Sequence, residues 1–260
     1  MRLLAAFTLI LSAFVIAGAV KPAPFVRQQP QGQPAVAEDL DSINKRVREL
    51  YGAKKYEEAA KLAQAAVEAA ERQFGPDSPQ VGMALMNLAN ILAVRRDVSK
   101  ARNAMTRLVA LREKHPGAPL PHEREALELF TCLDASDMKE KPNVELVKRI
   151  HRLLVEDSVL EQGYKLSPDK AELKGGELLS KPQPKYPGEA LDARARGAAI
   201  LRITIDEAGK VVEVAPLDCS SQIFNKAGAE AARRATFNPT LVNGKPVRVS
   251  SVIIYRFVIQ

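Results

Sequence analysis

The spacing of apolar residues changes once along the chain. From about residue 38 to residue 157, apolar positions, many of them alanines, recur at helical spacing, which predicts a series of amphipathic helices. After about residue 184 the spacing falls to two, because Leu201, Ile203 and Ile205 alternate with polar residues, as in a strand with one buried face. We therefore expect a multidomain chain with an all-α part followed by a small α+β part.

The helical part repeats itself. A shift of 42 residues aligns Leu50 with Leu92 and Gly75 with Gly117. Each unit is predicted to consist of a helix, a short turn and a second helix. Because one such unit cannot bury its apolar face alone, the repeat predicts a stacked helical solenoid.

The segment from Tyr51 to Ala93 carries a family resemblance. Its sequence, YGAKKYEEAAKLAQAAVEAAERQFGPDSPQVGMALMNLANILA, resembles tetratricopeptide repeats of the longer type found in kinesin light chains, with Gly52 and Tyr56 at matching positions. In the third unit Asp134 stands where the first two units have leucine, so a capping pair of helices is an alternative to a third repeat. The resemblance implies a concave surface for a protein or peptide ligand, and a spacer role is the alternative.

The N-terminus predicts export. A basic start, an apolar run from Leu3 to Val20 and an A-x-A motif predict a signal peptide over residues 1–19, cleaved after Ala19. An uncleaved anchor is the alternative, because this run approaches the lower length limit for a membrane span. Proline and glutamine in residues 20–37 predict an extended linker.

The other expected boundary lies at residues 158–183, where glycine and proline predict a second linker. This assigns the repeats to residues 38–157 and the last domain to residues 184–260.

Turn and helix signals subdivide the last domain. We expect a hairpin turn at Asp206–Lys210, a helix at Phe224–Arg234, a turn at Asn243–Pro246 and a long final strand at Val247–Ile259. The edge of such a strand is a candidate for pairing with another chain. The candidate partner-binding residues on it are Ser251, Val252, Ile253, Ile254, Tyr255, Arg256 and Phe257.

Two segments of this domain resemble the C-terminal domain of the TonB family of energy transducers. They read PKYPGEALDARARGAAILRITIDEAGKVVEV (residues 184–214) and FNKAGAEAARRATFNPTLVNGKPVRVSSVIIYRFVI (residues 224–259), with the D-x-x-G-K-V hairpin, the F-x-P step and the N-G-K-P-V turn of that family. Ala235 stands where the family often has an aromatic residue. The resemblance implies a helix packed on a three-stranded antiparallel sheet. It also implies binding in which an extended segment of an outer-membrane receptor adds to the sheet edge as a strand.

The resemblance further implies a non-enzymatic periplasmic protein that binds envelope or outer-membrane proteins, in transport-related energy transduction. The alternative location is the inner membrane, with a single N-terminal anchor facing the periplasm. In the family a histidine within the membrane span couples to the ExbB–ExbD proton channel, and the run Leu3–Val20 has no ionisable residue. We therefore expect binding without that motor. The alternative function is a repeat scaffold for envelope protein assembly, with the TonB-like domain as an anchor.

Charge and the remaining residues limit the chemistry. The net charge is +7, and residues 181–260 hold 12 basic against 7 acidic side chains, which suits either an acidic partner or a solvated face. No catalytic, nucleic-acid or metal-binding motif occurs, so we expect no enzyme activity, no cofactor, no metal and no nucleic acid partner. Membrane attachment is expected only with an uncleaved N-terminus. Cys132 and Cys219 are either separate thiols or one bridge.

Overall fold

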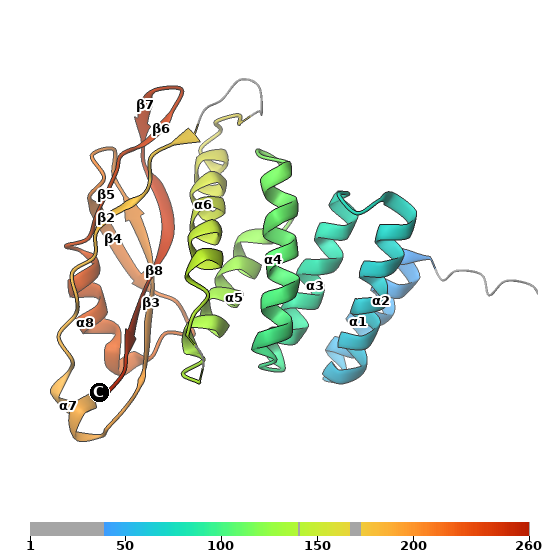
Figure 1. The fold of residues 1–260 in the computed structure, drawn as a ribbon, viewed down its shortest axis with the longest axis horizontal. Coiled ribbons are helices and arrows are strands. Elements are labelled where there is room, and N and C mark those ends of the chain that lie inside the picture. The colour runs from blue at the N-terminus through green and yellow to red at the C-terminus, as the bar shows by residue number, and fades with distance from the viewer. Residues whose placement is uncertain (1–38, 140, 167–172, 260) are drawn as a thin grey trace, which may run out of the picture. The chain divides into compact units, whose positions relative to one another are not determined.

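The computed structural model describes residues 39–139, 141–166 and 173–259. The predicted signal peptide or anchor and the first predicted linker therefore lie outside the described residues. Helices form the first part of the described chain and small sheets dominate the second (Figure 1). The helices of the first part are α1 (Leu40–Gly52), α2 (Tyr56–Phe74), α3 (Pro79–Val94), α4 (Val98–Lys114), α5 (Glu123–Ser136) and α6 (Val144–Glu161).

Side-chain caps and turns fix where these helices begin. Ser78, Asp97 and Asn143 precede α3, α4 and α6, and each accepts a hydrogen bond from the backbone N–H three residues further on. The turns before α2 and α4 each contain a residue in the left-handed conformation, because Lys54 and Arg96 have φ of 58° and 56°. These two residues are 42 positions apart, so the first two units repeat in structure as they do in sequence.

The third unit differs at the position that the sequence singled out. Asp134 in α5 is fully buried, and its carboxylate lies 2.5 Å from Nε of Arg102 in α4. An ion pair therefore replaces the leucine packing of the first two units, because a buried carboxylate needs a charged partner.

The largest sheet of the second part has the strand order β4-β3-β8 and is antiparallel throughout. Its strands are β3 (Gly197–Ile205), β4 (Val211–Pro216) and β8 (Val249–Phe257). Helix α8 (Gln222–Ala232) packs on one face, where Gly228 allows close approach: a Cβ on Gly228 would lie 2.5 Å from the Cβ of Ala199. This arrangement confirms the predicted helix on a three-stranded antiparallel sheet. The predicted strand Val247–Ile259 is shorter than expected, because Val247 belongs to the separate strand β7.

Residues 158–183, expected as a linker, contain the end of α6 and two short strands. Strand β1 (Leu173–Lys174) pairs with β6 (Thr240–Val242), which also pairs with β7 (Lys245–Val247). Strand β2 (Leu178–Ser180) pairs with β5 (Thr236–Phe237), and the short helix α7 (Gly188–Asp192) follows. Gly175 has φ of 77°, and a Cβ there would lie 2.0 Å from the carbonyl oxygen of Pro239, so this turn requires glycine.

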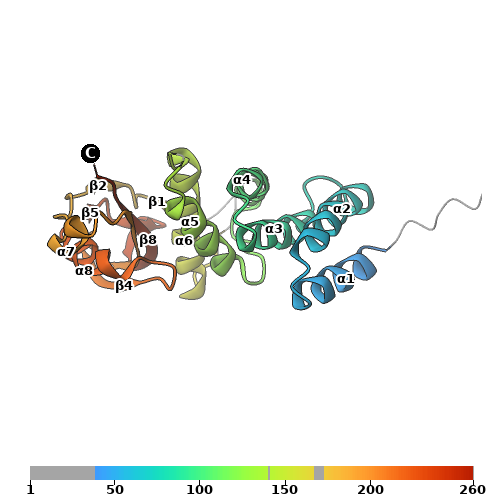
Figure 2. The same ribbon diagram turned by 90° about the horizontal axis from the view of Figure 1, so that it is seen from below.

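Three kinds of contact join the repeats to the sheet. Helix α6 lies beside β8, and α5 packs on the sheet face opposite α8 (Figures 1 and 2). Cys132 in α5 forms a disulfide with Cys219, which lies beyond β4, and Arg202 in β3 forms a two-bond ion pair with Glu128. Residues 38–260 consequently group as one compact unit. None of the described helices is long and apolar enough to cross a membrane.

Candidate protein-binding surfaces

The structure places all seven predicted partner-binding residues in β8, which is an edge strand of the sheet. Their side chains alternate. Ser251, Ile253, Tyr255 and Phe257 are buried on the side of α8, and the three between them are half-buried. The buried side chains hold β8 in place, so a partner can reach this strand chiefly through the backbone groups along its edge.

The register of β8 identifies which backbone groups face outward. Ile254 lies opposite Ile200 of β3. The backbone N–H and carbonyl of Ile200 point away from β8. The N–H donates to Ser220 Oγ, and the carbonyl accepts from the N–H of Leu217. Backbone groups alternate in direction along a strand, so those of Ser250, Val252 and Ile254 point away from β3.

Side chains in the last turns of α6 and at its C-cap, Gln162, cover the first half of this outer edge. Gln162 Nε2 donates to the carbonyl of Arg248 at 2.7 Å, and the N–H of Ser250 donates to Ser158 Oγ at 2.8 Å. A helix thus satisfies backbone groups that an incoming strand would otherwise pair with, which is a known way to protect a sheet edge.

His151 strengthens the same contact. One ring nitrogen, Nε2, lies 3.2 Å from the carbonyl of Gly176, and the other, Nδ1, lies 2.6 Å from Ser251 Oγ. Since a carbonyl can only accept, Nε2 carries the proton and Nδ1 accepts from the serine hydroxyl. Burial lowers the pKa of His151 and favours this neutral form.

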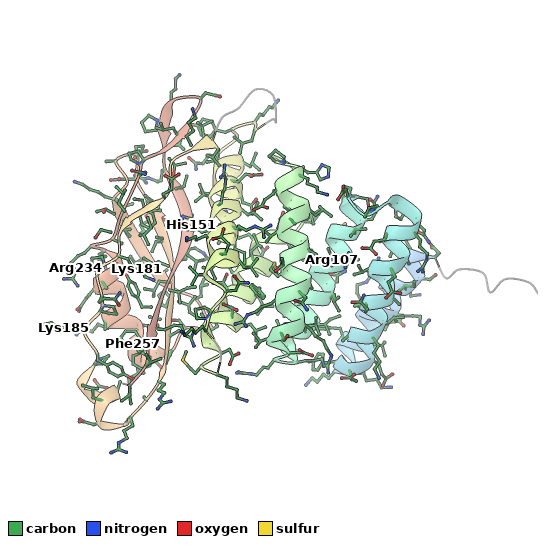
Figure 3. All side chains as sticks on the ribbon, viewed as in Figure 1. Arg107, His151, Lys181, Lys185, Arg234 and Phe257 are labelled. Atoms are coloured by element: carbon green, nitrogen blue, oxygen red, sulfur yellow. A yellow bond between two sulfur atoms is a disulfide. The ribbon has the colours of Figure 1, made fainter. Side chains whose placement is uncertain are left out.

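One lysine contacts the second half of the edge. Lys181 Nζ donates to the carbonyl of Ile254 at 2.6 Å and lies 4.9 Å from the centre of the Tyr255 ring. Although much of the lysine is exposed, packing of its ammonium group against β8 lowers its pKa through desolvation. Figure 3 shows Lys181 and Phe257 in the sheet domain, well away from Arg107 of the repeats.

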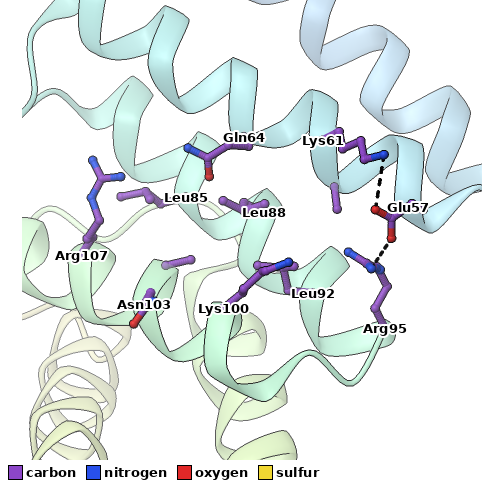
Figure 4. Close-up of a pocket in the computed structure, with 12 residues that line it drawn as sticks. Glu57, Lys61, Gln64, Leu85, Leu88, Leu92, Arg95, Lys100, Asn103 and Arg107 are labelled. Carbon is purple, nitrogen blue, oxygen red and sulfur yellow. Dashed lines mark ion pairs between the residues drawn. The ribbon is translucent and has the colours of Figure 1, made fainter.

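A second surface is a groove in the helical repeats. Helices α2, α3 and α4 enclose a cavity of about 480 Å³. Leu85, Leu88 and Leu92 line its floor, and polar side chains surround it (Figure 4). The polar lining residues are Glu57, Lys61, Gln64, Arg95, Lys100, Asn103 and Arg107.

The lining of this groove is positive. It holds four cations and one carboxylate, Glu57, which pairs with both Lys61 and Arg95. The side chains of Lys61 and Lys100 are 77% and 68% exposed and pair with Glu57 and Asp97, so both ammonium groups lie at the surface. An apolar floor with a cationic rim suits an acidic peptide.

A buried ionic cluster lies where α4, α5 and α6 meet. Arg112 Nε bonds both carboxylate oxygens of Glu123 at 2.8 Å, and its Nη2 lies 3.1 Å from Glu156 and 4.0 Å from Asp157. Burial and the neighbouring Glu123 raise the pKa of Asp157 to about 7. This cluster connects the helices internally and faces neither surface described above.

The comparisons with known proteins follow these two parts of the chain. Residues 182–259 match the family model for the Gram-negative bacterial TonB protein C-terminal region. These residues form a TonB-type C-terminal domain. Residues 50–114 match the tetratricopeptide repeat. Both resemblances drawn from the sequence are thereby confirmed, and both families are protein-interaction domains.

Solved structures also match this chain, and one of them is similar to the TonB-type domain. It is the solution NMR structure of the Pseudomonas aeruginosa TonB CTD, with 24% sequence identity and a TM-score of 0.28, and the match covers 36% of this chain and 94% of that one. The comparison with curated proteins gave no match.

The sequence located β8 but not what surrounds it. The partners of its edge, Ser158, Gln162 and Lys181, all lie in residues 158–183, which the sequence predicted to be a linker. Nothing in their spacing relates them to β8, so only the folded arrangement identifies them. The groove was expected as a concave surface, but its lining residues were not named.

Proposed function

We propose that this chain is a non-enzymatic, protein-binding adaptor of the bacterial periplasm. In this proposal the TonB-type domain holds an extended segment of an envelope or outer-membrane protein as an added strand along β8. The match of residues 182–259 to the TonB C-terminal family supports the envelope location and a role in protein interaction. A role in energy transduction for transport, without the usual proton-driven motor, belongs to the same proposal.

The position of β8 supports strand addition most directly. It is a nine-residue strand at the edge of the sheet, and among the described residues its outer edge meets side chains and no other strand. Backbone pairing needs an exposed row of N–H and C=O groups and few special side chains. The carbonyl of Ile254 is such a group, because one flexible lysine is its outer partner among the described residues.

A pair of proline substitutions tests this proposal. Ile254→Pro removes an outward N–H and should abolish capture of an envelope partner by the full chain in a crosslinking pull-down, with the fold retained by circular dichroism. Tyr255→Pro serves for comparison, because the backbone of Tyr255 faces β3 and this proline should disrupt the sheet itself, which circular dichroism would detect. Unchanged capture by a folded Ile254→Pro protein would refute strand addition at β8.

The groove favours a second candidate function, a repeat scaffold that binds an acidic peptide of an envelope assembly. The cationic rim over an apolar floor is the observation that supports it. Replacing Lys61 and Lys100 together by glutamate should abolish partner capture through the groove without unfolding the repeats. Lys148→Glu is the control, because Lys148 is 71% exposed and lies on α6 outside the groove.

These point substitutions identify the binding surface more directly than deletion of the repeats or of the TonB-type domain would. The repeats and the TonB-type domain share a disulfide, an ion pair and the contact between α6 and β8. Removing one part would expose the core of the other, so lost binding would not identify the binding surface.

A further inference from the structure

The outer edge of β8 divides into two halves with different partners. Over Arg248–Ser251, side chains of α6 bond the strand, and the hydrophobic residues Val155 and Val159 of the same helix pack into the core beneath it. Opening this half would expose apolar core residues to water. Among the described residues, the outer carbonyl of Ile254 accepts one hydrogen bond, from Lys181, and this side chain can leave without disturbing the core.

The positive charge of Lys181 has no acidic partner among the described residues. Desolvation is the one cause that lowers the pKa of this lysine. Its ammonium group relies on a carbonyl oxygen and the face of the Tyr255 ring. Arg234 adds to the local positive charge, because it lies near enough to Tyr255 to oppose the rise in that residue's pKa.

A strand that pairs with β8 must replace Lys181 as the hydrogen-bond donor to the carbonyl of Ile254. The displaced ammonium group would then lose its acceptor while remaining close to the new strand. A carboxylate on that strand would restore a charge-assisted hydrogen bond, which is stronger than the bond to the carbonyl that it replaces. A neutral side chain would leave the ammonium group without a partner.

We propose that the partner strand pairs with Ile254–Phe257 only, and that it carries a carboxylate which binds Lys181. This inference rests on the proposed strand addition and specifies its position and the chemistry of its partner. The occupant is therefore an extended acidic segment of another protein. A second copy of the chain, pairing through β4, is an outcome that the test distinguishes.

Two synthetic heptapeptides with blocked ends provide the probes. In both, threonine and valine alternate around a central residue, which is glutamate in one and glutamine in the other. Each is titrated at up to millimolar concentration into the isotope-labelled full chain, and the backbone amide signals are followed by NMR. Lys181→Gln removes the proposed contact, and Lys185→Gln is the matched control, because Lys185 is also an exposed lysine of the TonB-type domain.

The glutamate peptide should shift the amide signals of Ile254 and Arg256, whose N–H groups both point away from β3, and leave that of Ser250 unchanged. It should bind about two- to fivefold more tightly than the glutamine peptide, which is the range for an exposed ion pair. Lys181→Gln should abolish this difference, and Lys185→Gln should preserve it.

Three results would overturn the inference. Equal binding of both peptides at β8 would remove the acidic requirement and leave strand addition intact. Shifts confined to Ser250 or to Val212 and Val214 of β4 would show that the pairing position is wrong, the latter together with dimerisation. No shift anywhere in the sheet would refute strand addition itself.

Discussion

Replacing Asp157 by asparagine should make the folded chain more stable, and the gain should depend on pH. Asp157 lies in α6 beside Ser158, within the buried cluster around Arg112. Burial, with the charge of Glu123, raises its pKa from 3.8 to about 7. The folded state therefore binds this proton more tightly than the unfolded state.

The raised pKa determines the sign and the size of the change in the free energy of unfolding. Below pH 3.8 the carboxyl is neutral in both states and costs nothing. As the pH rises toward 7, the unfolded state ionises first and stability falls, and the loss is complete above the folded pKa. A shift of about three units corresponds to about 4 kcal/mol as an upper value, so we expect Asp157→Asn to gain about 2–4 kcal/mol at pH 8.

Urea unfolding of the full chain at pH 4.5, 6 and 8, with the disulfide intact, measures this difference. The gain of Asp157→Asn over the wild type should increase across the series. Asp192→Asn, at an exposed aspartate of α7, is the matched control. A gain that stays constant from pH 4.5 to pH 8, or a loss of stability at pH 8, would refute the reasoning.

Three further substitutions test contacts that shape the binding surface. Replacing Cys132 and Cys219 by serine should cost about 2–4 kcal/mol in urea unfolding, and an unchanged midpoint would show that the bridge does not constrain the unfolded chain. Gly228→Ala should cost about 1–3 kcal/mol because its Cβ would meet that of Ala199, whereas Gly188→Ala, with nothing within 4 Å, should be tolerated. Ser158→Ala should speed hydrogen exchange at the Ser250 amide about two- to tenfold, and equal exchange rates would contradict the edge contact.

The sequence predicted the elements whose signal is local. Helical spacing and the 42-residue repeat predicted the first two units, and the structure shows Lys54 and Arg96 of these units in the same backbone conformation. Alternating residues and the glycine turn at Gly209 gave the hairpin of β3 and β4. In each case a few neighbouring residues determine the structure.

Features set by distant residues could not be read in the same way. Strands β1 and β2 have two and three residues, too few to show a period, and glycine and proline around them favoured a linker. The spacing of Cys132 and Cys219 left the disulfide open because 87 residues separate them. The partners of the β8 edge required the packing of α6 against the sheet, which depends on the whole fold.

Amide hydrogen exchange of the full chain, alone and in complex with an isolated envelope partner, tests strand addition at β8 most directly. If the partner adds as a strand at β8, it should slow exchange at Ile254, whose N–H points outward, and leave exchange at Val214 of β4 unchanged. Equal exchange at Ile254 with and without the bound partner would contradict strand addition.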